Sequence, residues 1–142
     1  MALGANAKLD LIKGAPLFEQ CSKKDLQRIA QIADEIDLRA GKVLMQEGER
    51  GREFFVIVSG EVEVRRKGRK LATLGPGSFV GEMALLSKAP RVATVTAATP
   101  LDVLVITERA FLDLLEKMPD LCIKVARALA ERVGANELSD RR

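Results

Sequence analysis

Three residues close together in the chain, Gly81, Glu82 and Arg91, are suited to hold a small anionic ligand. Arg91 carries a planar guanidinium that can donate to two phosphate oxygens at once. Glu82 can only accept hydrogen bonds when ionised, so it needs a donor such as a sugar hydroxyl. Gly81 lacks the Cβ that would keep a ligand away from the backbone. Together they predict a ligand that carries both a phosphate and a ribose.

The residues after Gly81 are expected to form a short helix with the glycine at its mouth. The first turn of a helix has backbone N–H groups without partners inside the helix, and it carries a partial positive charge. A phosphate is a suitable acceptor at that position. Backbone amides would therefore add to the attraction supplied by Arg91.

The segment around these residues reads Phe-Val-Gly-Glu-Met-Ala-Leu-Leu and, after a spacer, Pro-Arg-Val-Ala-Thr. It resembles the phosphate-binding cassette of cyclic nucleotide-binding domains, and the similarity extends from about Leu9 to Val133. The resemblance implies that Glu82 binds the ribose 2′-hydroxyl and Arg91 the cyclic phosphate. It also implies that backbone amides complete the cradle, those of Gly81, Met83, Ala84 and Val92. The cassette departs from the family pattern where Val80 separates Phe79 from Gly81, and where Val92 replaces the usual Ala, Ser or Thr.

The whole sequence predicts an α+β fold, an antiparallel, jelly-roll-like β-roll flanked by N-terminal helices and two C-terminal helices. We expect residues 1–142 to form a single domain, since this length can bury one core. Its parts are a helical segment at 1–34, the β-roll at 35–106 with the cassette at 79–94, and C-terminal helices at 107–142.

Local signals indicate where these elements begin and end. Ser22 with Asp25 resembles a capping box, and Thr107 is a good N-cap for a helix bearing Phe111, Leu114 and Leu115. Runs rich in β-branched residues predict strands, at 53–58, 62–64, 91–96 and 101–106. Pro119 suits the first turn of a final helix, and Gly134 is the expected stop.

In the family, the final helix acts as a lid that swings over the base. Three of its residues are candidates to cap the base: Arg127, Leu129 and Arg132. Packing in the core is an equally good interpretation of each. We expect one apolar face on this helix, formed by Cys122, Val125, Leu129 and Val133, and we expect both Cys21 and Cys122 to be buried.

Composition restricts the class of protein. Hydrophobic residues make up 47% and charged residues 30%, which is typical of a soluble globular protein, and no apolar run is long enough for a membrane span. The N-terminus lacks a signal-peptide pattern, and two cysteines indicate a cytoplasmic location. The sequence has no histidine, which excludes a histidine-based triad and a cupin-type metal cluster. We therefore expect no metal, no cofactor beyond the nucleotide ligand and no catalytic residues.

The functional hypothesis is a regulatory cyclic-nucleotide sensor that acts on a covalent or non-covalent effector domain. We expect cAMP to be favoured over cGMP, because related cGMP sites often carry Thr after the arginine and Val92 has no hydroxyl. Three alternatives stay open: the sensor module of a DNA-binding regulator, a degenerate domain that no longer binds, and a phosphodiesterase.

The basic run at 65–70 is a further candidate feature, because it could contact nucleic acid or anionic lipid. A hairpin turn with solvated charges and Lys67-Gly68 at its tip is the favoured interpretation. No aromatic residue lies among these charges to stack on bases. We expect no nucleic-acid binding by this chain alone.

Overall fold

A computed structural model describes the backbone of residues 3–140 and the side chains of residues 3–131. At the N-terminus lie α1 (Ala5–Lys13), the 3₁₀ helix η1 (Pro16–Phe18) and α2 (Lys23–Ile32). Eight strands follow in the described chain: β1 (Asp34–Leu38), β2 (Val43–Met45), β3 (Glu53–Ser59), β4 (Val62–Arg66), β5 (Arg69–Leu74), β6 (Phe79–Val80), β7 (Thr94–Ala97) and β8 (Leu101–Thr107). The 3₁₀ helix η2 (Glu82–Leu85) lies between β6 and β7, and α3 (Glu108–Lys117) and α4 (Pro119–Asp140) end the fold.

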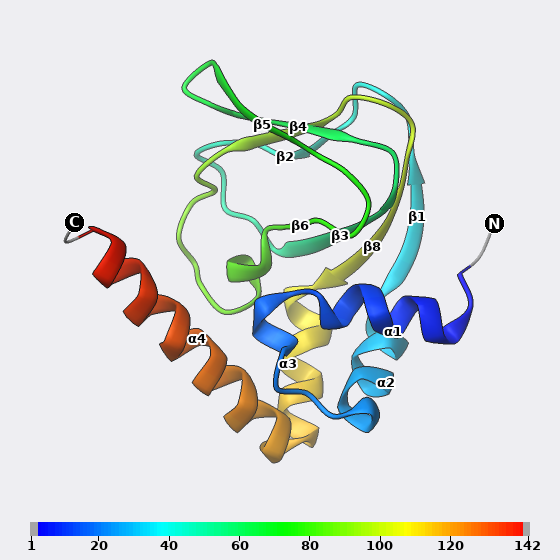
Figure 1. Ribbon diagram of the computed structural model, residues 1–142, viewed down its shortest axis with the longest axis vertical. Coiled ribbons are helices and arrows are strands. Elements are labelled where there is room, and N and C mark those ends of the chain that lie inside the picture. Colours follow the sequence, from blue (N-terminus) through cyan, green and yellow to red (C-terminus); the bar gives the residue numbers. More distant parts are fainter. Residues whose placement is uncertain (1–2, 141–142) are drawn as a thin grey trace.

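The strands form two antiparallel sheets, with the orders β1-β8-β3-β6 and β2-β7-β4-β5. Figure 1 shows them wrapped into a roll, with α1, α2 and α3 packed below it and α4 extending along one side. The predicted α+β architecture, a β-roll flanked by helices, is confirmed.

Strands β3 and β8 are buried on both faces, which explains their nearly continuous apolar sequences. Successive side chains of a strand point to opposite faces. Phe54 and Val56 of β3 therefore pack into the helical core, whereas Phe55 and Ile57 face the interior of the roll. Strand β8 alternates in the same way, and it pairs with β3 along most of its length. This pair joins the helical layer to the roll.

Side-chain caps begin two of the helices as predicted. At α2, the Ser22 hydroxyl accepts from the Asp25 amide at 3.2 Å, and the Asp25 carboxylate accepts from the Ser22 amide at 2.9 Å. At α3, the Thr107 hydroxyl accepts from the Ala110 amide at 3.2 Å. The apolar face of α3 is buried, through Phe111, Leu114 and Leu115. These caps fix where the helical segments leave the strands.

The basic run forms the β4–β5 hairpin, as expected. Lys67 and Gly68 at its tip both have positive φ, 51° and 78°, which is the geometry of a tight type I′ connection. The Lys67 amide donates to a Glu47 carboxylate oxygen at 2.9 Å. The charged side chains from Arg65 to Lys70 are exposed.

Two predicted boundaries are wrong. The strand expected at 91–96 begins only at Thr94, because the backbone of Arg91 bonds to a turn rather than to a sheet: its amide donates to the Glu49 carbonyl at 2.8 Å, and its carbonyl accepts from the Gly48 amide at 2.9 Å. The final helix continues through Gly134 to Asp140, so that glycine is not a stop.

The prediction of the buried face of α4 is right for two residues and wrong for one. Val125 is buried and Leu129 packs partly against the helical core, as expected, whereas Cys122 is exposed. Leu121 and Ala128 are buried as well. The inward positions follow helical spacing from Leu121 rather than from Cys122. Cys21 is buried, as expected, and Val133 lies outside the residues whose side chains are described. No helix in the described part of the chain combines the length and apolarity needed to cross a membrane.

Candidate functional site

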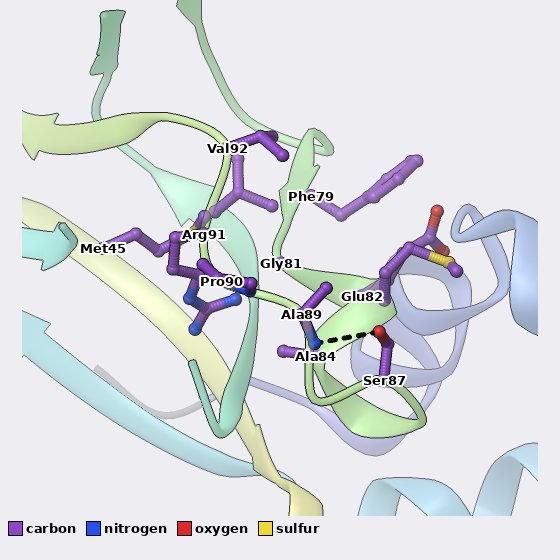
Figure 2. Close-up of a pocket in the computed structure, with 12 residues that line it drawn as sticks. Met45, Phe79, Gly81, Glu82, Ala84, Ser87, Ala89, Pro90, Arg91 and Val92 are labelled. Carbon is purple, nitrogen blue, oxygen red and sulfur yellow. Dashed lines mark hydrogen bonds between the residues drawn. The ribbon is translucent and has the colours of Figure 1, made fainter. Parts of the chain in front are cut away.

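A cavity of about 310 Å³ lies beside the cassette, and all six predicted ligand-contacting residues line it. Gly81, Glu82, Met83 and Ala84 come from the turn after β6, whereas Arg91 and Val92 come from the loop before β7. Met45 of β2 also lines it. Figure 2 shows these residues around the cavity. The structure thus brings two separate parts of the cassette to one place.

The turn after β6 is tighter than the helix that we expected. Gly81 has φ 82°, a left-handed conformation that favours glycine, and η2 is a single 3₁₀ turn over four residues. The Ala84 amide donates back to the Gly81 carbonyl at 3.0 Å. A single turn sums few peptide dipoles. Attraction for an anion must therefore come mainly from Arg91 and from individual backbone amides.

Arg91 is held deep in the site, with only 8% of its surface exposed. Its Nη2 donates to the Glu53 carbonyl oxygen at 2.7 Å, which uses one of the five N–H donors of a guanidinium. Burial lowers the pKa of Arg91, and the nearby Glu53 carboxylate acts in the opposite direction. The ordinary pKa of arginine is so high that the side chain keeps its charge at neutral pH.

Two glycines touch this guanidinium, and sequence reasoning identified only one of them. A Cβ added at Gly81 would lie 2.5 Å from Arg91 Nη1, and one added at Gly51 would lie 1.7 Å from Arg91 Nε. Gly81 was expected to make room for a ligand; in the structure it also makes room for the arginine. The contact of Gly51 joins residues forty positions apart, so nothing in the local sequence signals it.

Glu82 begins η2 and is almost fully buried, with 4% of its surface exposed. Figure 2 shows its carboxylate and the Arg91 guanidinium on opposite sides of the cassette turn, directed away from each other. The adjacent Phe79 packs edge-on against Phe54, with ring centroids 6.2 Å apart, and also lines the cavity. The cassette is therefore anchored on the helical core.

The rim of the cavity is apolar. Val92 has 69% of its surface exposed and Met83 38%, although both are large hydrophobic residues. Exposed apolar groups beside a polar site are suited to contact the flat face of a base.

None of the described residues of α4 lines this cavity. Arg127 is exposed, and Leu129 is half-buried against the helical core. The side chain of Arg132 lies outside the described residues. In this structure, Arg127 and Leu129 are therefore not brought to the site with the cassette residues. No group of three or more acidic, Cys or His side chains with metal-binding geometry occurs among the described residues.

Comparison with curated proteins gives relatives of regulatory type. The chain is 42% identical over 112 residues to the cAMP-dependent protein kinase regulatory subunit of Mycosarcoma maydis, which covers 70% of this chain and 21% of that protein. It is 35% identical over 125 residues to a cyclic nucleotide-gated potassium channel of Mesorhizobium japonicum, covering 88% of this chain and 35% of the channel. The chain therefore spans between about a fifth and a third of the length of these relatives.

Solved structures with the same fold include the N-terminal domain of a transcriptional regulator from Streptomyces coelicolor A3(2). Its TM-score is 0.82 at 28% identity, over 92% of this chain and 94% of that one. The regulatory domain of Toxoplasma gondii PKA with cAMP has a TM-score of 0.71 at 29% identity, over 77% of this chain and 43% of that one.

A model of the family described as "Cyclic nucleotide-binding domain" matches residues 35–118, which include the strands from β2 to β8, all of β1 except Asp34, the cassette and α3. This match covers more than half of the chain and contains every residue of the cavity described above. The chain belongs to the cyclic nucleotide-binding domain family.

Proposed function

We propose that residues 1–142 form a regulatory sensor that binds cAMP through the cassette. The observation that carries this proposal is the buried Arg91 guanidinium at a cavity bordered by the amides of the Gly81 turn. A cyclic phosphate would take its charge-assisted hydrogen bonds from Arg91 and from the amides of Gly81, Met83 and Val92. The Ala84 amide, which the sequence also suggested, would first have to release the Gly81 carbonyl, to which it donates at 3.0 Å. Domains of this family in protein kinase regulatory subunits support the choice of ligand class.

Glu82 is the proposed partner of the ribose 2′-hydroxyl. Its carboxylate now points away from Arg91, so we expect the side chain to rotate toward the sugar when the ligand binds. The apolar rim at Met83 and Val92 would then contact the base.

The preference for cAMP over cGMP rests on Val92. This residue offers no hydroxyl to a guanine amino group, and one such hydrogen bond contributes about 0.5–1.5 kcal/mol. We expect Val92→Thr to narrow the difference in affinity between the two nucleotides by that amount. Calorimetric titration of both ligands into both proteins measures it, and an unchanged ratio would contradict the assignment.

The signal is proposed to leave through the C-terminal helices. The residues of α4 whose side chains are described, up to Glu131, do not line the cavity, so a ligand that favours a closed position can move this helix toward the base. A ligand shifts such an equilibrium only through its different affinities for the two positions. The effector is a covalent or non-covalent partner domain, as in the much longer regulatory relatives.

The decisive experiment removes any co-purified nucleotide by mild unfolding and refolding, then titrates cAMP and cGMP by calorimetry. We expect cAMP to bind with micromolar or tighter affinity, and Arg91→Ala to lose several kcal/mol because each charge-assisted bond contributes about 1.5–3 kcal/mol. Equal binding by Arg91→Ala would refute the phosphate assignment. Absence of heat with both ligands would indicate a degenerate scaffold domain, and 5′-AMP in the mixture would indicate an enzyme.

A further inference from the structure

Gly51, in the loop between β2 and β3, is buried against the guanidinium of Arg91. A Cβ built at this position would lie 1.7 Å from Arg91 Nε, 1.9 Å from Cζ and 2.5 Å from Nη2. The backbone of Gly51 is not left-handed, unlike that of six other glycines in the described chain. Other residues could therefore adopt this backbone conformation. Glycine is needed at position 51 because the Arg91 guanidinium occupies the space where a Cβ would lie.

The same loop holds Arg91 through its backbone as well. The Glu49 carbonyl accepts from the Arg91 amide at 2.8 Å, and the Gly48 amide donates to the Arg91 carbonyl at 2.9 Å. The Glu53 carbonyl, two residues after Gly51 in the chain, accepts from Arg91 Nη2 at 2.7 Å. These contacts hold the backbone of Arg91 and the end of its side chain, and the guanidinium lies against Gly51.

We propose that Gly51 is a positioning residue for the phosphate-binding arginine, which rests on the function proposed above. Together with Gly81, whose Cβ would lie 2.5 Å from Nη1, it forms a slot that sets the direction of the planar fork. The orientation of the guanidinium matters, because two hydrogen bonds to one phosphate form only when its planar N–H groups face the phosphate oxygens.

A side chain at Gly51 should move the arginine rather than the backbone. The atoms that it would meet belong to the far end of a flexible side chain, which can change rotamer. The loop backbone is held by its hydrogen bonds to Arg91 and by those of β3. Gly51→Ala is therefore expected to fold and to bind cAMP weakly.

The test compares Gly51→Ala with Gly75→Ala in cAMP titrations, with folding checked by thermal melts. Gly75 also lacks a left-handed backbone, and a Cβ there meets nothing within 4 Å. We expect Gly51→Ala to lose roughly tenfold or more in affinity, the range of a lost charge-assisted hydrogen bond. Gly75→Ala should bind like the parent. A Gly51→Ala protein that melts normally and binds like the parent overturns the proposal.

Combination with Arg91→Ala separates positioning from a general structural effect. Alanine lacks the Nε, Cζ and Nη2 atoms that the added methyl group of Gly51→Ala would meet. Gly51→Ala should therefore cost little further affinity in an Arg91→Ala protein, although it costs much in the parent. An equal loss in both backgrounds would show that Gly51 acts through the loop and not through Arg91. Failure of the parent itself to bind cAMP would instead refute the proposed function.

Discussion

At the residue scale, Arg91 and Glu82 are charged residues at buried positions, and the burial of a charge costs free energy that hydrogen bonds or an opposite charge must offset. Arg91 is 8% exposed and Glu82 is 4% exposed, and both line one cavity. A phosphate would compensate the buried guanidinium with charge-assisted bonds. The proposed roles, Arg91 for the phosphate and Glu82 for the ribose hydroxyl, can be tested separately with a ligand that lacks the hydroxyl.

The role of Glu82 predicts a specific coupling with the ribose. The parent should bind 2′-deoxy-cAMP more weakly than cAMP by about 1.5–3 kcal/mol, since a hydrogen bond to a charged carboxylate is lost. Glu82→Ala should bind both ligands equally, because it has no acceptor for the hydroxyl. Competition titrations of the four combinations measure this coupling. If Glu82→Ala still discriminates against the deoxy ligand, another residue contacts the hydroxyl.

Asp102 lies away from the cavity, and its environment predicts that the stability of the protein depends on pH. It faces Asp37 across the β1–β8 pair. Burial, a hydrogen bond with Glu35 and the charges of Glu35 and Asp37 raise the pKa of Asp102 from 3.8 to about 6. The folded state therefore binds this proton more tightly than the unfolded chain does. Its stabilising contribution is present below about pH 4 and is lost as the pH rises through about 6.

Substitution of Asp102 by Asn imitates the protonated carboxyl. We expect Asp102→Asn to melt at a higher temperature than the parent at pH 7.5. The difference in melting temperature should shrink toward zero near pH 4, because the carboxyl of the parent is then protonated in the folded protein. Thermal melts across this range measure it. Asp34→Asn removes the same charge from an exposed position of β1 and serves as the control. A constant difference at every pH would contradict the shifted pKa.

At the scale of elements, the β2–β3 loop connects the cassette arginine to the start of α3. Besides its contacts with Arg91, it carries Arg50, whose Nη2 forms an ion pair with Glu108 at 2.8 Å. The Glu108 amide donates to the Arg52 carbonyl at 2.8 Å. A shift of Arg91 on ligand binding can thus reach α3 through one short loop.

This connection predicts that Glu108→Gln weakens signalling more than binding. The pair is partly exposed, and such pairs contribute about 0.2–1 kcal/mol, so the fold should persist. A fluorescent probe on the exposed Cys122 reports movement of α4. We expect a smaller probe response to saturating cAMP, with affinity changed far less than in Arg91→Ala.

The control for this prediction is Glu63→Gln, which breaks the pair between Glu63 and Arg65 on β4 of the roll. Its probe response should match that of the parent. Equal responses in Glu108→Gln and Glu63→Gln would show that the signal reaches α4 by another route.

The sequence predicts an element well when the interactions that form it lie between residues close together in the chain. The Ser22 cap, the Thr107 cap and the alternating runs of β3 and β8 are local signals, and the structure confirms them. The start of β7 was placed wrongly because Arg91 pairs with a turn some forty residues earlier. The contact of Gly51 has the same non-local origin. The six residues predicted from the cassette do line one cavity, but the contacts with the β2–β3 loop that hold Arg91 have no signal within the cassette.

At the scale of the whole molecule, the helical layer and the roll share the buried pair of strands, so we expect them to unfold together. The N-terminal segment is tied to α4 by Lys124 Nζ, which lies 2.6 Å from the Asp25 carboxylate. Although burial opposes it, hydrogen bonds from Lys124 and Ser22 lower the pKa of Asp25. This contribution is present at neutral pH and is lost as the pH falls through the lowered pKa.

The two cysteines make this cooperativity measurable. Cys122 is exposed and should react with a thiol reagent at once, whereas Cys21 is buried beside Asp25. Burial, with a smaller effect of the Asp25 charge, raises the pKa of the Cys21 thiol to about 11, so little thiolate exists at neutral pH. Cys21 should therefore react mainly when the protein unfolds.

Binding of cAMP in the roll should then protect Cys21, although the thiol lies in the helical layer. A ligand at 100 times its Kd stabilises the folded state by about 2.7 kcal/mol, which lowers the unfolded population about a hundredfold. We expect the labelling rate of Cys21, followed by mass spectrometry, to fall by about that factor, and that of Cys122 to change little. The same concentration of cAMP should leave Arg91→Ala unprotected. If bound cAMP does not lower the labelling rate of Cys21, the N-terminal helices open independently of the nucleotide site.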